Sequence, residues 1–507
     1  MSGGRVPPSA IAAGPGGTTE RLGGTRVDVP KALIDRFRAD GVDVSSEPEA
    51  REEAARDWWP LSIGWAARGQ VPARPAVVAR PTTVDHVASV LARCNEAAIP
   101  VTATAGGSGV CGGSIPVFGG VSLDLRGLSG LADLDETSLL ADVGAGTFGP
   151  DLEAMLRSAG SGYTFGHWPQ SMDISTVGGW IACRGAGQYS TRYGKIEDLV
   201  EGLEVVLADG TVIRTDGAAP RSATGPSLTQ LFVGSEGTLG VVTGARLRIT
   251  PSPAADDRRA LGFGSFADGL DACRQILRRG ATPAVLRLYD ETESKRNFDT
   301  ESCVMVIYDE ADPVVVEATL SVCDHECAGA DRLDDELVTR WLHERNDTSA
   351  LGPLWKANIV VDTIEIAGRW SVLPGLAADV VATLRGIEGT LNASVHESHA
   401  YPDGACLYFT FGGRRPAGGE PDDAAQLAWQ ETYYREAWDA ATACVLAHGA
   451  AISHHHGIGL NRSRFLAEAL GSGFSVLQSV KDALDPAGIL NPGKLGLASR
   501  FGPTPWP

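Results

Sequence analysis

The chain has 507 residues, 43% of them hydrophobic, and a formal net charge of -20. This length is sufficient for two or three domains with sizeable cores. The negative charge argues against a nucleic-acid-binding protein, because neutralising phosphate groups requires a basic face.

The N-terminal stretch "MSGGRVPPSAIAAGPGGTTERLGG" has no apolar signal-peptide core, and the sequence holds no apolar run long enough to cross a bilayer. We therefore expect a cytoplasmic protein whose residues 1–27 are disordered. The nine cysteines fit reduced thiols in that compartment. Cys323 and Cys327 flank His325, but a zinc site would need further ligands, so we interpret them as two helix positions one turn apart.

Residues 28–74 predict a helical segment, and a new organisation begins at residue 75. The stretch "AVVARP" predicts a buried strand, and "TTVDHVASVLARCNEA" predicts a helix with Thr82 as its N-cap. The next strand, "IPVTATAGG", runs into glycines. This order predicts a βαβ start followed by α+β structure.

Further along, "GPDLEAMLRSAG" predicts a helix that begins near Pro150, and "LEVVLADGTVIRT" predicts a hairpin with Asp209 and Gly210 at its turn. Prolines and acidic residues after "ARLRITPSP" place a boundary near residue 253, so that 75–252 forms one domain. Residues 253–445 mix strands such as "SCVMVIYD" and "CLYFTFGG" with long helices and predict a second α+β domain. Residues 446–507 form a C-terminal segment.

The loop "TATAGGSGVCGG" follows a predicted strand, as a phosphate-binding loop would. It matches neither the dinucleotide-binding pattern G-x-G-x-x-G nor the P-loop pattern, which argues against both of those folds. Its small residues allow backbone N–H groups to turn inward as a nest for a pyrophosphate. Taken alone, a glycine-rich turn between strands explains the loop equally well.

Three further stretches favour the ligand-binding interpretation: "PQSMDISTVGGWIACRGAGQYSTRYGKIEDLV", "GPSLTQLFVGSEGTLGVV" and "DPAGILNPGK". Together with the glycine loop they resemble the FAD-binding domain of the vanillyl-alcohol oxidase and p-cresol methylhydroxylase superfamily. The resemblance implies an α+β fold with a PCMH-type, two-subdomain FAD-binding domain and an α+β cap domain for the substrate. It also implies that the C-terminal tail returns to pack on the FAD domain.

The resemblance implies FAD as the cofactor, bound without a covalent link because the pyrophosphate loop offers no histidine. The residues that it assigns to FAD are Thr104, Ala105, Gly106, Gly107, Ser108, Gly109, Val110, Pro169, Ser171, Asp173, Ser175, Thr176, Gly178, Gly179, Ala182, Arg184, Glu236, Gly237, Thr238, Gly240, Val241 and Val242.

Within this superfamily the blocks "STVGGW", "YGKIEDLV", "LYFTF" and "SHHHGIG" are similar, in order, to those of the alkylglycerone-phosphate synthase family. In that family an acyl dihydroxyacetone phosphate exchanges its fatty acid for a fatty alcohol through a flavin N5 adduct, as a step in ether lipid synthesis. A histidine and tyrosine pair would accept and return the proton that leaves carbon.

Three adjacent histidines, His454, His455 and His456, are the candidate acid-base groups. Side chains of neighbours in an extended chain face opposite ways, and no cysteine or carboxylate pair lies nearby in the sequence, so we expect no metal site. An imidazole exchanges protons readily near neutral pH. The resemblance gives His455 the central role and matches Tyr408 to the family's active-site tyrosine; alone, Tyr408 is equally well explained as a core aromatic.

The sequence departs from the family at the arginine that binds the substrate phosphate, where "LGPLWKANIVVDTIEIAGRW" offers only Lys356. Lysine neutralises a phosphate but does not bind it bidentately. Arg287 is a second candidate for this contact.

The alternative is an FAD-dependent oxidoreductase of a 2-hydroxy acid such as D-lactate. Such enzymes usually place an acidic residue before a single His-Gly, where this chain has "SHHHGIG". A flavin-binding protein without catalysis would have no reason to combine Tyr408 with the histidine run. We expect a homodimer that acts on a small or lipid-like substrate, with no nucleic-acid partner; the sequence leaves peripheral membrane contact open.

Overall fold

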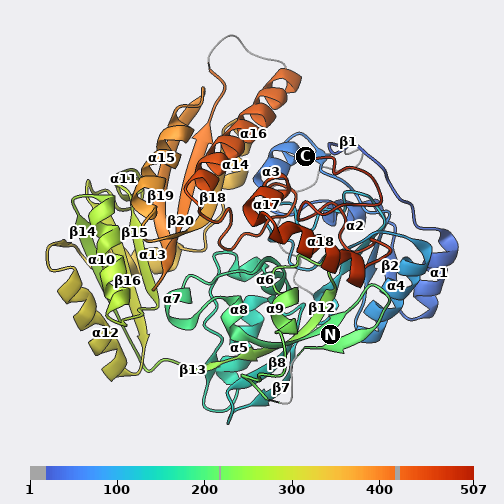
Figure 1. The fold of residues 1–507 in the computed structure, drawn as a ribbon, viewed down its shortest axis with the longest axis horizontal. Coiled ribbons are helices and arrows are strands. Elements are labelled where there is room, and N and C mark those ends of the chain that lie inside the picture. Colours follow the sequence, from blue (N-terminus) through green and yellow to red (C-terminus); the bar gives the residue numbers. More distant parts are fainter. Residues whose placement is uncertain (1–18, 216–218, 417–422, 507) are drawn as a thin grey trace.

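The computed structural model describes residues 19–215, 219–416 and 423–506. Two smaller sheets and their helices form one body, and a seven-stranded sheet with its helices forms another beside it (Figure 1). We call the first the two-sheet domain and the second the cap domain. The α+β fold predicted from the sequence is confirmed.

The first small sheet has the strand order β2-β4-β6-β5, in which β4, β6 and β5 are parallel. Helix α4 (Val84–Ala97) connects β4 to β5, as the βαβ pattern predicted. Its N-cap is Thr83, whose hydroxyl accepts a hydrogen bond from the His86 N–H, and not Thr82; Thr83 has the extended backbone of a cap residue. The strands are β2 (Asp43–Ser45), β4 (Val77–Arg80), β5 (Val101–Thr104) and β6 (Val121–Asp124).

The second small sheet is antiparallel, with the order β11-β10-β12-β8-β7. Strands β10 and β11 form the predicted hairpin, with Val206 opposite Val212 next to the turn. The strands are β7 (Leu131–Asp135), β8 (Leu140–Gly144), β10 (Val200–Val206), β11 (Val212–Arg214) and β12 (Val241–Arg248). The accompanying helices are α5 (Gly149–Ser158), α6 (Val177–Cys183), α7 (Ser190–Tyr193), α8 (Ile196–Leu199) and α9 (Leu228–Phe232).

Residues 19–27 of the N-terminal segment are ordered, although the sequence predicted disorder there. Strand β1 (Thr19–Glu20) pairs with β3 (Gln70–Val71), and the Val27 N–H donates to the Phe118 carbonyl. The prediction of disorder is therefore wrong for residues 19–27, because tertiary pairing fixes a stretch of low local preference; residues 1–18 lie outside the described residues. Helices α1 (Lys31–Ala39), α2 (Pro48–Glu53) and α3 (Pro60–Ala66) follow.

The cap sheet has the order β17-β14-β16-β15-β19-β20-β18. Its strands are β14 (Ala255–Phe263), β15 (Val285–Tyr289), β16 (Cys303–Ala311), β17 (Asp331–Arg332), β18 (Val360–Arg369), β19 (Thr390–Tyr401) and β20 (Gly404–Gly413). The helices are α10 (Phe266–Arg278), α11 (Glu291–Phe298), α12 (Pro313–Glu326), α13 (Glu336–Glu344), α14 (Leu351–Lys356), α15 (Leu373–Arg385) and α16 (Asp423–Ala447).

Alternation along β20 decides which side chains reach the other domain. Leu407, Phe409 and Phe411 are fully buried in the core cluster that includes residues of α10, α12 and α15. Tyr408 and Thr410, between them, therefore face the opposite side of the sheet, where they line a cavity. Tyr408 therefore faces away from Leu407 and Phe409, as the alternation of side chains along a strand predicts.

After α16 the chain leaves the cap, and α17 (Ser463–Leu470) and α18 (Gly473–Leu484) lie against the two-sheet domain (Figure 1). The Lys481 ammonium donates to the Thr238 carbonyl, and the Asn491 N–H donates to the Val101 carbonyl at the edge of the first sheet. The tail thus returns to the domain expected to hold FAD. In the described ranges, no helix combines the length and apolarity needed to cross a membrane.

Candidate active site

A cavity of about 900 Å³ separates the glycine loops of the two-sheet domain from the facing side of the cap sheet. Its lining includes Trp58 and Gly106 on one side, Thr363 and Tyr408 on the other, and His455 from the C-terminal segment. Three regions that are far apart in the sequence therefore meet at one site.

The glycine loop after β5 fits a pyrophosphate. A side chain at position 106 would collide with the Ile174 carbonyl oxygen at 2.3 Å, so only glycine allows this close approach. Gly107 has φ +63, and no neighbouring atom lies within 4 Å of the point that a Cβ would occupy, which leaves this backbone open to the cavity. The N–H groups from Gly106 to Val110 donate no hydrogen bond within the described residues, so they are free for an anionic ligand.

Most residues that the resemblance assigned to FAD lie on this cavity. Those that line it are Thr104, Ala105, Gly106, Gly107, Ser108, Gly109, Val110, Pro169, Ser171, Thr176, Gly178, Gly179, Ala182, Glu236, Gly237, Gly240, Val241 and Val242. Four do not: Asp173, Ser175, Arg184 and Thr238.

Two of these four have clear structural roles instead. The Ser175 hydroxyl accepts a 2.7 Å hydrogen bond from the Trp180 indole and so orients α6. Arg184 is the left-handed C-cap of α6, with φ +58, and its half-exposed guanidinium pairs with Glu197 at 3.3 Å. The direct role of Arg184 toward FAD stays a prediction that the side-chain direction does not support.

Glu236 joins the two-sheet domain to the C-terminal segment. Its carboxylate accepts hydrogen bonds from the N–H groups of Ile458 and Gly459 at 2.6 and 2.8 Å, directly after the histidine run. Its backbone carbonyl accepts from the Asn491 amide at 2.7 Å. A residue assigned to FAD from its motif therefore also fixes the position of the histidines.

The histidine run is bent, in contrast to the extended conformation assumed from the sequence. The Nδ1 atoms of His454 and His455 lie 3.0 Å apart, and the rings of His455 and His456 are 4.4 Å apart between centroids. His455 and His456 line the cavity, whereas His454 lies behind them. Neighbouring side chains of this run therefore do not face opposite ways, because that alternation holds only for extended chains, and the prediction made from it is wrong here.

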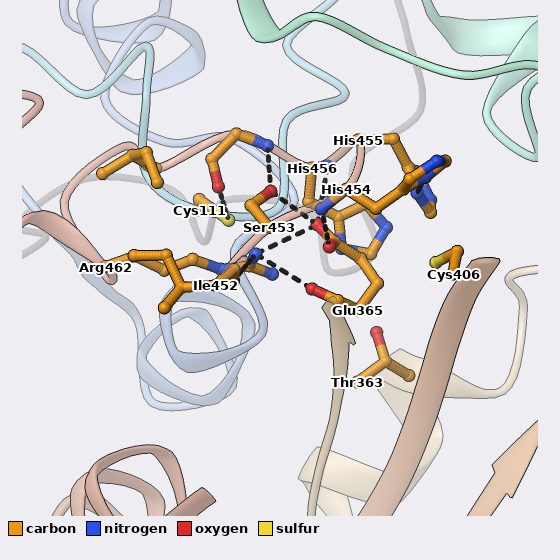
Figure 2. Close-up of polar contacts among 12 residues, drawn as sticks. Cys111, Thr363, Glu365, Cys406, Ile452, Ser453, His454, His455, His456 and Arg462 are labelled. Carbon is orange, nitrogen blue, oxygen red and sulfur yellow. Dashed lines mark hydrogen bonds and ion pairs between the residues drawn. The ribbon is translucent and has the colours of Figure 1, made fainter. Parts of the chain in front are cut away.

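Glu365 of β18 produces this bend (Figure 2). Its fully buried carboxylate accepts hydrogen bonds from the N–H groups of His454 and His456 at 2.5 and 2.7 Å and from the Ser453 hydroxyl at 3.0 Å. Arg462, also buried, pairs with the same carboxylate at 3.0 Å and donates to the Ile452 carbonyl at 2.7 Å. One carboxylate therefore collects donors from both ends of the histidine run.

Tyr408 lies within the ring cluster above the histidines. Its ring is stacked on His396 at 4.8 Å, nearly parallel to His455 at 6.1 Å and perpendicular to His456 at 5.6 Å between centroids. His396 in turn contacts Glu293 through Nδ1 at 2.8 Å. The phenol and two imidazoles of the run thus share one wall of the cavity.

Burial keeps the groups of this cluster uncharged. It lowers the pKa of His456 to about 4 and those of His454 and His455 well below the ordinary value, and it raises the pKa of Tyr408. A neutral imidazole carries both a donor and an acceptor nitrogen, so it can take up one proton and release another.

Glu365 behaves differently because it is paired. Burial alone would raise its pKa, but the buried Arg462 and the backbone N–H groups of His454 and His456 outweigh burial and lower the pKa below its ordinary value. The carboxylate is therefore charged beside neutral histidines, which suits an anchor rather than a proton carrier.

Two histidines of the run, together with two residues of the cap sheet, have the composition of a metal site. His399, Cys406, His454 and His455 offer ligand atoms within 4.8 Å of one another, and nitrogen and sulfur donors suit zinc. The Nε2 atoms of His399 and His454 are buried without a hydrogen-bond partner among the described residues. No cysteine lies near the histidines in the sequence, but β20 brings Cys406 to them from across the fold, which corrects the expectation of no cysteine there.

The two candidates for substrate contact lie in different places. Arg287 of β15 lines the cavity and is 8% exposed. Lys356, at the end of α14, is exposed and does not line the cavity, whose wall at this helix is formed by Ala350, Leu351 and Leu354. The placement supports Arg287 and gives no support to the substrate contact predicted for Lys356.

Several cavity or cluster residues were not predicted from the sequence. His167 lines the cavity with both ring nitrogens unpartnered among the described residues, and burial lowers its pKa to about 3. Glu365, His396, His399 and Arg345 were likewise not singled out. For His167 the adjacent "PQS" block was the available signal; the others depend on long-range packing.

Comparison with known proteins identifies two consecutive domains. Residues 75–216 match the FAD binding domain, and residues 253–495 match the C-terminal domain of FAD linked oxidases. Together these matches span most of the chain, and they place the glycine loop in the first domain and the histidine run in the second.

Curated relatives cover most of the chain at modest identity. Alkyldihydroxyacetonephosphate synthase of Dictyostelium discoideum is 29% identical over 470 residues, which is 84% of this chain and 74% of that protein. The uncharacterized FAD-linked oxidoreductase YgcU of Escherichia coli K12 is 28% identical over 445 residues, 83% of this chain and 89% of the relative. Glycolate oxidase subunit GlcD of Bacillus subtilis is 27% identical over 453 residues, 86% and 92% respectively.

Solved structures share the fold. A structure of alkyldihydroxyacetonephosphate synthase superposes with a TM-score of 0.74 at 24% identity, covering 94% of this chain and 87% of that chain. Substrate-bound p-cresol methylhydroxylase superposes with a TM-score of 0.74 at 18% identity, covering 93% and 98%. With both matched domains in order and a glycine loop shaped for a pyrophosphate, the chain belongs to the FAD-linked oxidase family and is an FAD-dependent enzyme.

Proposed function

We propose that the chain exchanges the acyl group of an acyl dihydroxyacetone phosphate for a fatty alcohol, as an alkylglycerone-phosphate synthase does. The observation that carries the proposal is the cluster of Tyr408, His455 and His456 on the cavity wall, all in their neutral forms. The relatives from Dictyostelium discoideum, Trypanosoma brucei brucei and Caenorhabditis elegans named alkyldihydroxyacetonephosphate synthase, at 27–29% identity, support the choice of reaction.

The chain's own residues would divide the work as follows. Bound FAD supplies the redox-active ring system beside which the substrate carbon reacts. His455 accepts the proton that leaves this carbon and later returns it, with Tyr408 as hydrogen-bonding partner to the substrate oxygen. Overall, the fatty acid leaves with the cleavage of a carbon–oxygen bond, the alcohol forms the new one, and no net oxidation occurs.

The second candidate is oxidation of a 2-hydroxy acid, with FAD as the electron acceptor. The similarity to the GlcD subunit over 86% of this chain favours it. His455 argues against this second candidate, because the hydroxy-acid enzymes usually carry an acidic residue at that position.

Anaerobic mixing of the holoenzyme separates the two. With an acyl dihydroxyacetone phosphate and an isotope-labelled fatty alcohol, we expect label in an ether product and free fatty acid, without net reduction of the flavin. With D-lactate, we expect no bleaching of the flavin absorbance. Stoichiometric bleaching by D-lactate and no ether product would select the oxidoreductase. The cytoplasmic location and homodimer stay proposals of the sequence analysis.

A further inference from the structure

The C-terminal stretch "NPGK", residues 491–494, contacts the glycine loop that follows β5. Every second carbonyl from residue 109 to residue 115 accepts a hydrogen bond from a segment outside the loop. These bonds run from the Trp58 N–H to Gly109 at 2.8 Å, from the Leu460 N–H to Cys111 at 2.8 Å, from the Asn491 side-chain amide to Gly113 at 2.9 Å and from the Lys494 ammonium to Ile115 at 2.7 Å. Three of the four donors therefore come from the C-terminal segment, two of them from residues 491–494.

Residues 491–494 form a turn that brings both donors to the loop. Pro492 has a fixed φ and Gly493 has φ +84, as expected at the two central positions of a type II turn. Asn491 and Lys494 are the first and last residues of this turn. Neither lines the cavity, whereas Gly113 does, so the turn contacts the loop from the side away from the cofactor site.

The same tail also pairs with the strand that leads into the loop. The Val101 N–H of β5 donates to the Ile489 carbonyl, and the Asn491 N–H donates to the Val101 carbonyl, both at 2.8 Å. Strand β5 ends at Thr104, directly before the loop. Residues 489–494 therefore hold the chain before the loop and after it.

Lys494 is fully buried and yet has no ion-pair partner. Its ammonium donates to the Ile115 carbonyl and lies 3.4 Å from the Asn491 side-chain oxygen, and no carboxylate oxygen of the described residues lies within 4.0 Å of it. Burial lowers the pKa of Lys494 to about 7, although Asp57 and Glu236 oppose this effect. A buried cation is costly for packing alone, and an anion nearby stabilises it.

We propose that Asn491 and Lys494 are positioning residues for FAD: they hold the glycine loop in the shape that receives the pyrophosphate, and the Lys494 ammonium adds a positive charge behind it. Five glycines, at positions 106, 107, 109, 112 and 113, make this loop flexible in isolation, and ordering it on binding would weaken affinity. Contacts that order the loop in advance remove this loss. The bound cofactor and the docked tail therefore stabilise each other, whichever reaction the chain catalyses.

The test is the release of FAD from the holoenzyme, followed as the rise of flavin fluorescence after dilution. We expect Lys494→Met to release FAD about 10- to 100-fold faster, as loss of a hydrogen bond from a charged donor does. Asn491→Gly removes only the side-chain amide, because glycine accepts the backbone φ of +38 at this position. This second variant should also release FAD faster.

Arg500→Met is the matched control. Arg500 is a cation of the same tail, but it is exposed and donates to the Ala487 carbonyl within the tail at 2.7 Å. Because water screens an exposed charge, FAD release from this variant should change less than about 2-fold. Circular dichroism of each variant establishes that it is folded.

Hydrogen exchange separates positioning from a general loss of stability. In the Lys494→Met holoenzyme, peptides from residues 106–115 should exchange faster while the cap sheet keeps its protection. In a Gly107→Glu protein, which we expect to lack FAD, peptides from residues 485–497 should exchange faster although the tail itself is unaltered, because coupling between two sites is reciprocal. Three results would overturn the proposal: wild-type FAD release in both tail variants, acceleration spread equally over both domains, or an unchanged tail in the Gly107→Glu protein.

Discussion

Replacing Glu365 by glutamine should loosen the histidine run from its anchor. The glutamine keeps one acceptor oxygen, but its NH₂ group replaces an oxygen that accepts from a backbone N–H, and Arg462 loses its buried counter-charge. Breaking a buried ion pair by removing one partner typically costs about 3–5 kcal/mol. Since every 1.4 kcal/mol is a factor of ten, about 3 kcal/mol of local destabilisation corresponds to roughly 100-fold faster exchange of the protected amides.

Hydrogen exchange measured by mass spectrometry on peptides that contain the N–H groups of His454 and His456 is the direct assay, because it reports this segment rather than the whole chain. Turnover should fall by about 10²- to 10⁴-fold if the histidines act in proton transfer. The double variant Glu365→Gln/Arg462→Met removes the stranded charge and is the control: it should regain stability without regaining turnover. Unchanged exchange and full turnover in Glu365→Gln would refute the anchoring role.

Four further predictions concern the cofactor, the acid-base pair, pH and metal. Acid precipitation should release FAD into the supernatant, and Gly107→Glu should abolish FAD binding by placing a carboxylate in the pyrophosphate nest; flavin retained in the pellet would show a covalent link. His455→Ala and Tyr408→Phe should keep FAD but lose about 10²- to 10⁴-fold in turnover, with a double variant little worse than the worse single one, whereas multiplicative losses would mean separate roles. Burial lowers the pKa of His456 from its ordinary value of 6.5 to about 4, so the unfolded chain binds the extra proton between these values, and this histidine alone should cost about 3 kcal/mol of stability as pH drops from about 6.5 to 4; a His456→Gln variant with the same pH profile as the wild type would contradict this. Chelators should leave turnover intact if the cluster of His399, Cys406, His454 and His455 works through free imidazoles, whereas stoichiometric zinc that is lost together with activity would assign it to a metal.

Local patterns predicted the parts of the fold that local geometry controls. The βαβ start, the hairpin at Asp209 and Gly210, and the outward direction of Tyr408 each follow from a period of two or 3.6 residues or from turn chemistry. The glycine loop could also be predicted from the sequence, because the close approach of the Ile174 carbonyl oxygen to Gly106 excludes any side chain there.

Long-range contacts explain what the sequence did not reveal. The bend of the histidine run depends on Glu365, which is 89 and 91 positions away from its two backbone donors. Cys406 reaches the histidines only because β20 crosses the cap sheet beside β18. Lys356 was expected at the substrate because of its position before "VVDTIEIAGRW", but α14 ends with this side chain exposed, while Arg345, before that helix, lines the cavity. The local periodicity of the sequence carries no information on such long-range contacts.

The anchoring of the histidine run explains why it lies in the C-terminal segment rather than on either sheet. Glu236, from the two-sheet domain, accepts the N–H groups of Ile458 and Gly459 on one side of the run, and Glu365, from the cap, accepts those of His454 and His456 on the other. Because one carboxylate from each domain holds this segment, the position of its imidazoles is fixed relative to both the glycine loops and the cap side of the cavity. A shift of the cap relative to the two-sheet domain would therefore strain these hydrogen bonds and displace the imidazoles from the cavity wall.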